Sequence, residues 1–124
     1  MTARGFYQPN DAWVGDVIPW QEDGVFHLFY LHADRGATTG GMPWYRVTTE
    51  DLVTYRENGE AIASGGSLAE DFNIYTGSIV LDDQGTHHAF YTGQNPENLG
   101  QDGRALQLVM HATSHDNMTS WQRH

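Results

Sequence analysis

The stretch at residues 13–31 decides the fold: Trp13-Val14-Gly15-Asp16-Val17-Ile18-Pro19-Trp20-Gln21-Glu22-Asp23-Gly24-Val25-Phe26-His27-Leu28-Phe29-Tyr30-Leu31. Two apolar runs flank the turn Glu22-Asp23-Gly24, and Asp-Gly between apolar runs is the strongest short signal for a β-hairpin. Asp16 stands at the head of the first run, a common place for a residue that strands disfavour. The stretch therefore predicts a hairpin that carries a carboxylate at its open end.

Further strand-sized segments follow, each bounded by turn residues. Strands are predicted at 44–49, 74–81, 87–92 and 106–112, with a short edge piece at 60–63. Asn58-Gly59 and 82–85 are predicted turns, whereas 33–43 and 95–104 are predicted loops. No segment shows helical periodicity of useful length, so the chain is predicted to be mainly β.

The sequence also contains a weak internal repeat. Residues 16–30 combine a strand, an Asp-Gly turn and Phe-His-Leu-Phe-Tyr, and residues 78–91 combine a strand, an Asp-Asp-Gln-Gly turn and His-His-Ala-Phe-Tyr. Each unit continues with a Gly-containing loop, a third strand and an acid-containing turn before an aromatic residue. A multi-strand repeat with a period of about sixty residues is typical of β-propeller blades. The alternative is a sandwich of two sheets with similar turns.

Composition limits both the size of the protein and its partners. A chain of 124 residues has room for one domain with a modest core. Six basic residues against 16 acids, a net charge of -10, argue against binding to nucleic acid or to an anionic membrane surface. There is no cysteine, and we find neither a signal peptide nor an apolar run long enough to span a membrane. We therefore expect a cytoplasmic protein.

The histidines and glycines do not form a recognisable metal or cofactor site. His87 and His88 are adjacent on a predicted strand and should face opposite sides of it. His111 and His115 would share a face only in a helix, and their segment is predicted to be strand and turn. The glycines of the 33–43 loop lack the strand-to-helix context of a phosphate-binding loop. No cofactor and no metal are predicted.

Several motifs, in this order, resemble the start of the five-bladed β-propeller enzymes of glycoside hydrolase family 32 and of the related family 43. The motifs are Gly15-Asp16-Val17-Ile18-Pro19-Trp20, His27-Leu28-Phe29-Tyr30, Pro43-Trp44-Tyr45-Arg46, Asp51-Leu52-Val53 and Tyr75-Thr76-Gly77-Ser78. The resemblance covers nearly the whole chain. It implies an all-β fold of antiparallel sheets arranged as propeller blades, here an incomplete five-bladed propeller. Residues 1–124 would form one partial domain, with blades at about 12–63 and 74–124.

The resemblance also implies roles for individual residues. Asp16 matches the catalytic aspartate, which is the nucleophile in family 32 and the general base in inverting members of family 43. Trp44 matches a tryptophan before the Asp-Leu-Val turn, and Tyr75 and Thr76 belong to an aromatic-hydroxyl-Gly-Ser element. The predicted carbohydrate-binding residues are Trp13, His32, Asp34, Trp44, Tyr75 and Thr76.

The sequence departs from the family pattern at three places. Gly15-Asp16-Val17-Ile18-Pro19 replaces the usual Asn-Asp-Pro-Asn-Gly, and Leu31 stands where a glutamine normally follows Leu-Phe-Tyr. The Arg-Asp-Pro element and the acid/base glutamate lie in later blades, which this sequence lacks. Because glycoside hydrolysis uses two carboxyl groups, Asp16 supplies at most one of them. The acids Asp11, Asp34, Asp51 and Asp71 lie in predicted turns or loops, where caps and solvated charges are common.

Three functions are compatible with these observations. The chain is either a glycosidase-like protein that acts on a fructoside or related glycoside, a carbohydrate-binding module without catalysis, or a propeller fragment that self-associates. An unclosed propeller exposes strand edges and an apolar blade face. We therefore also expect a homo-oligomer formed through exposed blade edges.

Overall fold

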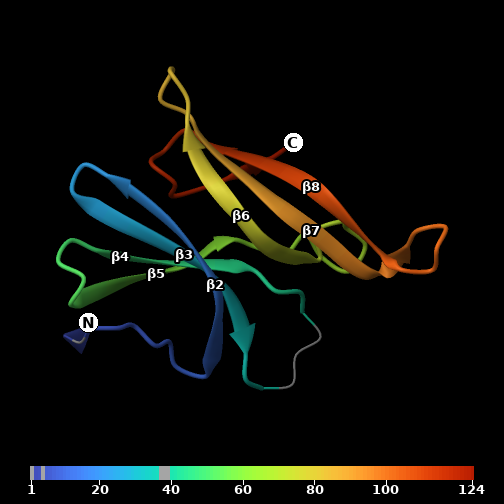
Figure 1. Cartoon of the computed structure of the whole chain (residues 1–124), viewed down its shortest axis with the longest axis horizontal. Helices are drawn as coiled ribbons and strands as arrows, with labels where there is room; N and C mark the ends of the chain where they lie inside the picture. Colours follow the sequence, from blue (N-terminus) through green and yellow to red (C-terminus); the bar gives the residue numbers. More distant parts are fainter. Residues whose placement is uncertain (1, 4, 37–39) are drawn as a thin grey trace.

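Nine β-strands form two antiparallel sheets in the computed structural model, which describes residues 2–3, 5–36 and 40–124. The first sheet has the strand order β1-β5-β4-β3-β2 and the second has the order β6-β7-β8-β9 (Figure 1). The strands are β1 (Thr2–Ala3), β2 (Ala12–Glu22), β3 (Val25–Asp34), β4 (Trp44–Thr49), β5 (Thr54–Ile62), β6 (Asn73–Leu81), β7 (His87–Leu99), β8 (Ala105–Ser114) and β9 (Gln122–Arg123). The described residues include no helix that is long and apolar enough to cross a membrane. The all-β prediction is confirmed.

The opening hairpin forms as predicted. Glu22 pairs with Val25, so the connection between β2 and β3 is the two-residue loop Asp23-Gly24. Both loop residues have positive φ, 52° for Asp23 and 77° for Gly24. Positive φ at both positions is the requirement of the type I′ turn, whose twist matches that of the flanking strands. The Asp-Gly signal therefore identified the turn correctly.

Two predicted boundaries are wrong because polar or turn-type residues lie inside strands. Asn58-Gly59 was expected to be a turn, but β5 runs through it, and Gly59 takes a φ of 82° beside register shifts against β4. A bulge accommodates such a residue without ending the strand. In the same way β7 continues to Leu99 through the predicted loop, where Asn95 donates to the carbonyls of Ser67 and Ala69. Of the predicted loop at 33–43, residues 37–39 lie outside the described residues.

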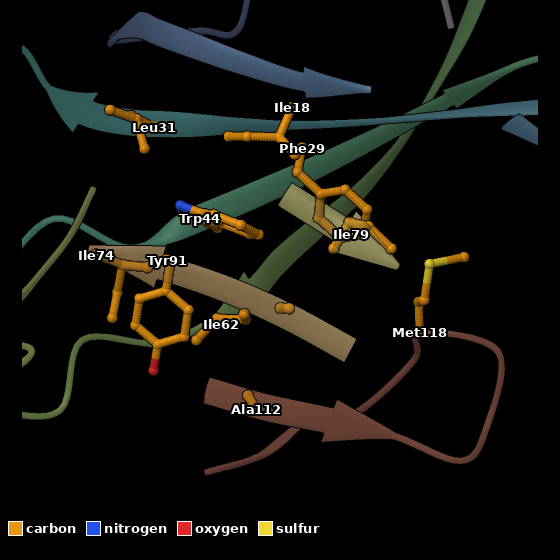
Figure 2. Close-up of a cluster of buried hydrophobic side chains, with 11 residues drawn as sticks. Ile18, Phe29, Leu31, Trp44, Ile62, Ile74, Ile79, Tyr91, Ala112 and Met118 are labelled. Atoms are coloured by element: carbon orange, nitrogen blue, oxygen red, sulfur yellow. The ribbon is translucent and has the colours of Figure 1, made fainter. Parts of the chain in front are cut away.

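The main core lies between the two sheets (Figure 2). Trp44 at its centre is fully buried, and its ring lies 5.8 Å from the rings of both Phe29 and Tyr91, measured between centroids. These separations are in the range of favourable aromatic pairs. The other buried members of this cluster are Ile18, Leu31, Ile62, Ile74, Ile79, Ala89, Ala112 and Met118. Burial of apolar side chains from both sheets is therefore what holds the sheets together.

A second, smaller cluster lies on the opposite face of the first sheet. Tyr30, Val47 and Tyr55 are buried there, and Tyr7 from the N-terminal segment packs against the rings of Tyr30 and Tyr55. The Tyr7 hydroxyl donates to Glu57, 2.8 Å away. The N-terminal segment therefore covers part of a face that would otherwise be open.

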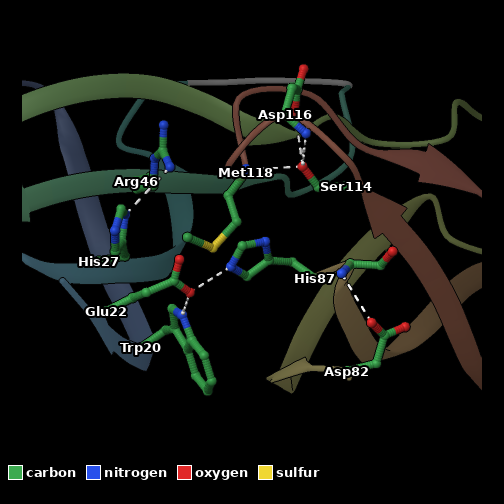
Figure 3. A network of polar contacts seen from close by, with 10 residues as sticks. Trp20, Glu22, His27, Arg46, Asp82, His87, Ser114, Asp116 and Met118 are labelled. Carbon is green, nitrogen blue, oxygen red and sulfur yellow. Dashed lines mark hydrogen bonds and ion pairs between the residues drawn. The ribbon is translucent and has the colours of Figure 1, made fainter. Parts of the chain in front are cut away.

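Polar contacts also link the two sheets, at the end opposite to the start of β2 (Figure 3). Glu22 Oε1 lies 2.7 Å from His87 Nε2 and accepts a hydrogen bond from Trp20 Nε1 at 3.0 Å. These two hydrogen bonds, from His87 first and then from Trp20, lower the pKa of Glu22. His27 lies nearby, with Nδ1 3.5 Å from a terminal nitrogen of Arg46. Burial first, and then the positive charge of Arg46, lowers the pKa of His27.

An ion pair between the buried Asp71 and the more exposed Arg123 fixes the segment between the sheets to the last strand. Asp71, only 2% exposed, accepts hydrogen bonds from Arg123 Nε at 2.7 Å and from the Tyr91 hydroxyl at 2.8 Å. Arg123 also donates to the carbonyl of Ala63. Asp71 was expected to be a turn cap or a solvated charge, but it is a buried link between the connection and β9.

We expect the substitution Asp71→Asn to lower the free energy of unfolding by about 1.5 to 3 kcal/mol, because Arg123 and Tyr91 lose hydrogen bonds to a charged acceptor. The measurement is urea denaturation followed by far-UV circular dichroism. Asp102→Asn is the control: Asp102 and Arg104 form an ion pair 4.0 Å apart whose side chains are 66% and 87% exposed. The control should cost less than about 0.5 kcal/mol. Equal losses for the two variants would contradict the assigned role of Asp71.

The stability should also depend on the protonation of His27. Because its pKa is lower in the folded chain than in the unfolded one, the unfolded state binds the proton first. The stabilising contribution is complete above the unfolded pKa of 6.5 and is lost as pH falls through the folded pKa. Urea denaturation between pH 7.5 and pH 5.5 should show this fall. This range extends about one pH unit on either side of the unfolded pKa of 6.5. His27→Gln should make the fall smaller, and the part that remains is expected from His111, whose pKa burial and the neighbouring His124 and His88 also lower. The exposed His115→Gln should leave the fall unchanged.

Candidate functional site

Two equivalent β-bulges define the candidate site. In the β2–β3 ladder Val14 pairs with His32 and Val17 with Tyr30, so that two residues, Gly15 and Asp16, stand opposite one. In the β6–β7 ladder Ile74 pairs with Gly93 and Gly77 with Tyr91, which leaves Tyr75 and Thr76 as the corresponding pair. The strands β2 and β6 are the neighbouring edges of the two sheets. Bulges re-aim side chains and are frequent beside active sites.

The two bulges bring Asp16 and Thr76 into contact. Thr76 Oγ1 donates to Asp16 Oδ2 across the gap between the sheets, at a distance of 2.5 Å. Both side chains are exposed. Asp16, predicted at the head of an apolar strand, lies in the middle of β2 and is held by the neighbouring sheet. The result is an accessible carboxylate that is fixed through one oxygen.

Close packing explains why glycines flank these residues. A Cβ at Gly15 would lie 2.8 Å from the Cβ of Leu31. A Cβ at Gly77 would collide with the backbone carbonyl of Phe90. Contacts this short require glycine, because Phe90 presents backbone that has no rotamer by which to move away. The bulged strands can therefore approach their neighbours closely.

Trp44 supports the second bulge from within the core. Its indole Nε1 donates to the carbonyl of Tyr75 at 2.9 Å. Because Trp44 is fully buried, direct contact of its side chain with a ligand does not fit this position. Its connection with the site is that it fixes the backbone of Tyr75, next to Thr76.

The other predicted carbohydrate-binding residues lie on both faces of the first sheet. Trp13 pairs with Ala33 and is 60% exposed, and the guanidinium of Arg35 lies 4.2 Å from its ring centre. His32 and Asp34 lie on the opposite face, because side chains alternate along β3. His32 Nδ1 is 3.5 Å from Asp34 Oδ1, and the ring of His32 stacks on Tyr45 at 3.7 Å. The structure thus joins Asp16 with Thr76, but it places His32 and Asp34 in a separate group.

Sequence reasoning missed a contribution from the segment before β4. The backbone N–H of Met42 donates to Asn73 Oδ1, and the backbone N–H of Ile74 donates to the carbonyl of Met42. Asn73 in turn donates to Gln94 at 2.9 Å. These bonds hold residues 42–43 beside the second bulge. An asparagine before a strand was the available signal, but nothing in the sequence indicated its partner.

The chemistry of this arrangement is that of one accessible carboxylate beside a hydroxyl. Such a carboxylate can accept hydrogen bonds from sugar hydroxyls, act as a base or attack an electrophilic carbon. Glycoside hydrolysis uses two carboxyl groups about 5 to 9.5 Å apart. Within the described part of the chain, the hydrogen-bonding partner of Asp16 is Thr76, and no His/Asp/Glu group of three or more could hold a metal ion.

Comparison with known proteins gives this arrangement a context. Residues 6–124 match the model of the glycosyl hydrolases family 32 N-terminal domain. The raffinose invertase of Escherichia coli is 33% identical over 95 residues, which are 76% of this chain and 20% of the relative. This chain therefore spans about a fifth of that relative's length.

Solved structures show the same fold. An exo-inulinase from Aspergillus awamori has a TM-score of 0.76 at 22% identity, over 98% of this chain and 27% of that protein. Fructan 1-exohydrolase IIa from Cichorium intybus has a TM-score of 0.74 at 24% identity, over 100% of this chain and 22% of that protein. The two sheets are therefore blades of a β-propeller, as predicted, and the family match extends over nearly all of the sequence. The chain belongs to glycosyl hydrolase family 32, with residues 6–124 matching part of the family's N-terminal domain.

Proposed function

We propose that this chain provides the nucleophile-bearing part of a site that hydrolyses fructosides. The observation that carries the proposal is the contact between Asp16 and Thr76, which sets one exposed carboxylate on the inner edge of the first blade. Family membership supports it, as do the names of similar proteins, which include invertases and a fructan exohydrolase. A variant of that fructan exohydrolase has also been solved in complex with 1-kestose, so a neighbour of the same fold binds 1-kestose.

Asp16 would attack the anomeric carbon of the bound fructosyl group. Its carboxylate oxygen forms the new C–O bond while the glycosidic C–O bond breaks, and the leaving oxygen takes a proton from a second carboxyl group. Water then hydrolyses the ester and restores Asp16. Thr76 contributes by holding Oδ2, so that the carboxylate keeps one orientation. Among the described residues, the side chain that bonds to Asp16 is a hydroxyl, that of Thr76. The second carboxyl group therefore has to come from a residue that does not contact Asp16 in this structure.

Two aromatic residues near the bulges, one exposed and one half-buried, would contact the sugar. Trp13 presents a ring that is 60% exposed, and Tyr75 adjoins Thr76 in the second bulge. Aromatic rings provide large apolar faces for such contacts. His32 and Asp34 remain predicted sugar contacts on the other face of the first sheet. A function without metal or cofactor, and a cytoplasmic location, also remain predictions.

Self-association without catalysis is the second candidate, and a specific surface favours it. A groove of about 150 Å³ opens on the face of the first sheet that points away from the second sheet. It is lined by Tyr7, Val14, Val17, Leu28, Tyr30, Val47 and Tyr55. Large exposed apolar patches are frequent at protein–protein contact surfaces, which supports this candidate.

An activated substrate tests the nucleophile without the second carboxyl group. Nitrophenolate leaves without prior protonation, so a nitrophenyl fructofuranoside needs only the attacking carboxylate. We expect the chain to release nitrophenol slowly, at a rate above that of buffer, and Asp16→Asn to abolish the release. Asp23→Asn is the control, because Asp23 is an exposed acid in a turn whose positive φ asparagine tolerates. The same release by Asp16→Asn and by the unmodified chain would disprove the proposal.

Thr76→Val should weaken the same activity while keeping the shape of the side chain. Loss of a hydrogen bond to a charged group is worth about 1.5 to 3 kcal/mol, which corresponds to roughly a 10- to 100-fold slower release. Thr76→Ser, which keeps the hydroxyl, should restore most of the rate. The measurement is the initial rate of nitrophenol release at saturating substrate. An unchanged rate in Thr76→Val would show that Thr76 does not orient Asp16.

A further inference from the structure

A hollow of about 300 Å³ lies beside β5, between the two blades. One wall consists of residues 58–61 of β5 with Arg46 of β4, and the other consists of Met118 and Thr119 in the loop between β8 and β9. Met118 belongs to the main core, through which the two blades pack on each other. The hollow is therefore a feature of the contact between the two blades.

Two β-bulges in β5 make room for this hollow. The register between β4 and β5 shifts twice, and the shifts leave Asn58 and Ala61 as extra residues without a partner in this ladder. Such extra residues bend the strand locally. Between them, Gly59 pairs with Arg46 and takes a φ of 82°. Because Gly59 has no side chain, the position opposite Arg46 in the ladder leaves space beside the guanidinium.

Arg46 carries a half-buried positive charge into this contact (Figure 3). Its guanidinium lies 5.9 Å from the ring centre of Phe29, and Nη1 lies 3.5 Å from His27 Nδ1. An imidazole nitrogen that accepts from arginine belongs to a neutral ring, so His27 does not compensate the charge. In the part of the chain that the structure describes, no carboxylate pairs with Arg46, whereas Arg104 and Arg123 each have an ion-pair partner. Burial lowers the pKa of Arg46.

Two acids lie near the hollow, but neither pairs with Arg46. The carboxylate of Asp116 accepts hydrogen bonds from the hydroxyl and the backbone N–H of Ser120, so it is already bound within its own loop. Its charge acts on Arg46 only without contact, where it opposes the effect of burial on the pKa. Glu60 pairs with Tyr45, whose ring packs in the smaller cluster on the opposite face of the sheet. A charge that is partly removed from water without a direct counter-charge is unfavourable, so this position favours an anion from solution.

Two further polar side chains of the hollow are available to such a ligand. Asn58 and Thr119 are exposed, and within residues 2–3, 5–36 and 40–124 neither side chain forms a hydrogen bond with another protein group. A guanidinium can bind an oxyanion through two parallel N–H···O bonds, and an amide or a hydroxyl can donate one more bond each. A volume of about 300 Å³ is at the lower end of the range for small-molecule sites.

We propose that this hollow binds a small oxyanion, a phosphate or a carboxylate, with Arg46 as its main ligand and with Asn58 and Thr119 as further donors. Neither Asp16 nor Thr76 takes part, so the inference is independent of the proposed function. The net charge of -10 opposes the approach of an anion to the chain. We therefore expect a weak site, with a Kd of about 1 mM for inorganic phosphate at neutral pH.

Titration with inorganic phosphate, followed by the NMR signals of the backbone amides, tests the site. Sodium chloride keeps the ionic strength constant, because screening alone alters interactions of exposed charges. We expect saturable shifts at residues 58–61 and 118–119. Arg46→Gln should raise the Kd about tenfold or more and Thr119→Ala about threefold, according to the usual values for charged and neutral hydrogen bonds. Arg104→Gln, at a position 87% exposed, is the control and should leave the Kd unchanged. No saturation by about 20 mM phosphate, or an unchanged Kd in Arg46→Gln, would overturn the proposal.

The titration of His27 gives a second, local measurement in the unmodified chain. Burial first, and then the charge of Arg46, lowers the pKa of His27, while Glu22 raises it and His87 lowers it. An anion bound to Arg46 offsets the guanidinium and leaves Glu22 and His87 in place. Saturating phosphate should therefore raise the pKa of His27, measured from its ring proton signals, and should leave it unchanged in Arg46→Gln. An unchanged pKa in the unmodified chain, or the same rise in Arg46→Gln, would contradict the site.

Other probes distinguish the class of ligand. Saturable shifts at the same residues with acetate as well as phosphate would support a site for both oxyanions, and shifts with phosphate alone would support a phosphate site. Equal binding of uncharged fructose would contradict the proposal, because the charge of Arg46 would then not select the ligand. Asp16→Asn should bind phosphate as the unmodified chain does, so a failure of the nucleophile proposal remains distinguishable from a failure of this one.

Discussion

The packing of one blade against the other is the interaction on which the rest of the structure depends. Trp44 shows this most directly, because a single side chain contacts Phe29 and Tyr91 and donates to the carbonyl of Tyr75. Its burial between the blades thus fixes both their separation and the backbone of the second bulge. Asp16 and Thr76 can form their hydrogen bond only when the blades are held in this register. The site is therefore a product of the core between the sheets and belongs to neither sheet alone.

Local signals in the sequence predicted the parts of the fold that local chemistry determines. Asp23-Gly24 specifies its turn by itself, since both residues tolerate positive φ, and the hairpin followed from it. The repeat of a strand, an acidic turn and Phe-Tyr likewise indicated two similar units. Asn58-Gly59 has the same local signal but lies within β5, because pairing with β4 outweighs the preference for a turn.

The candidate site was predicted only in part, because its geometry depends on contacts between distant residues. Asp16 and Thr76 are equivalent because each lies in a β-bulge. A bulge produces no regular pattern of residue types by which it could be recognised in the sequence. The distance of each residue from its hairpin turn does not reveal the equivalence either. The first hairpin has a two-residue loop, whereas the loop of the second spans residues 82–86. Trp44 was predicted to contact a ligand because it matches a family tryptophan before the Asp-Leu-Val turn. Tryptophan serves both binding and packing, so its burial could be established only from the tertiary structure.

The ion pair between Asp71 and Arg123 has a consequence for how the chain folds during synthesis. The two residues are 52 positions apart, and Asp71 lies in the connection that leaves the first blade. While the chain emerges from its N-terminus, the first blade can pair its own strands, but the carboxylate of Asp71 has no guanidinium to meet until β9 has been made. This ion pair is therefore one of the last contacts to form. In a nascent chain the first blade could therefore form before the Asp71–Arg123 ion pair does. Its inner apolar face would stay exposed until the second blade had folded.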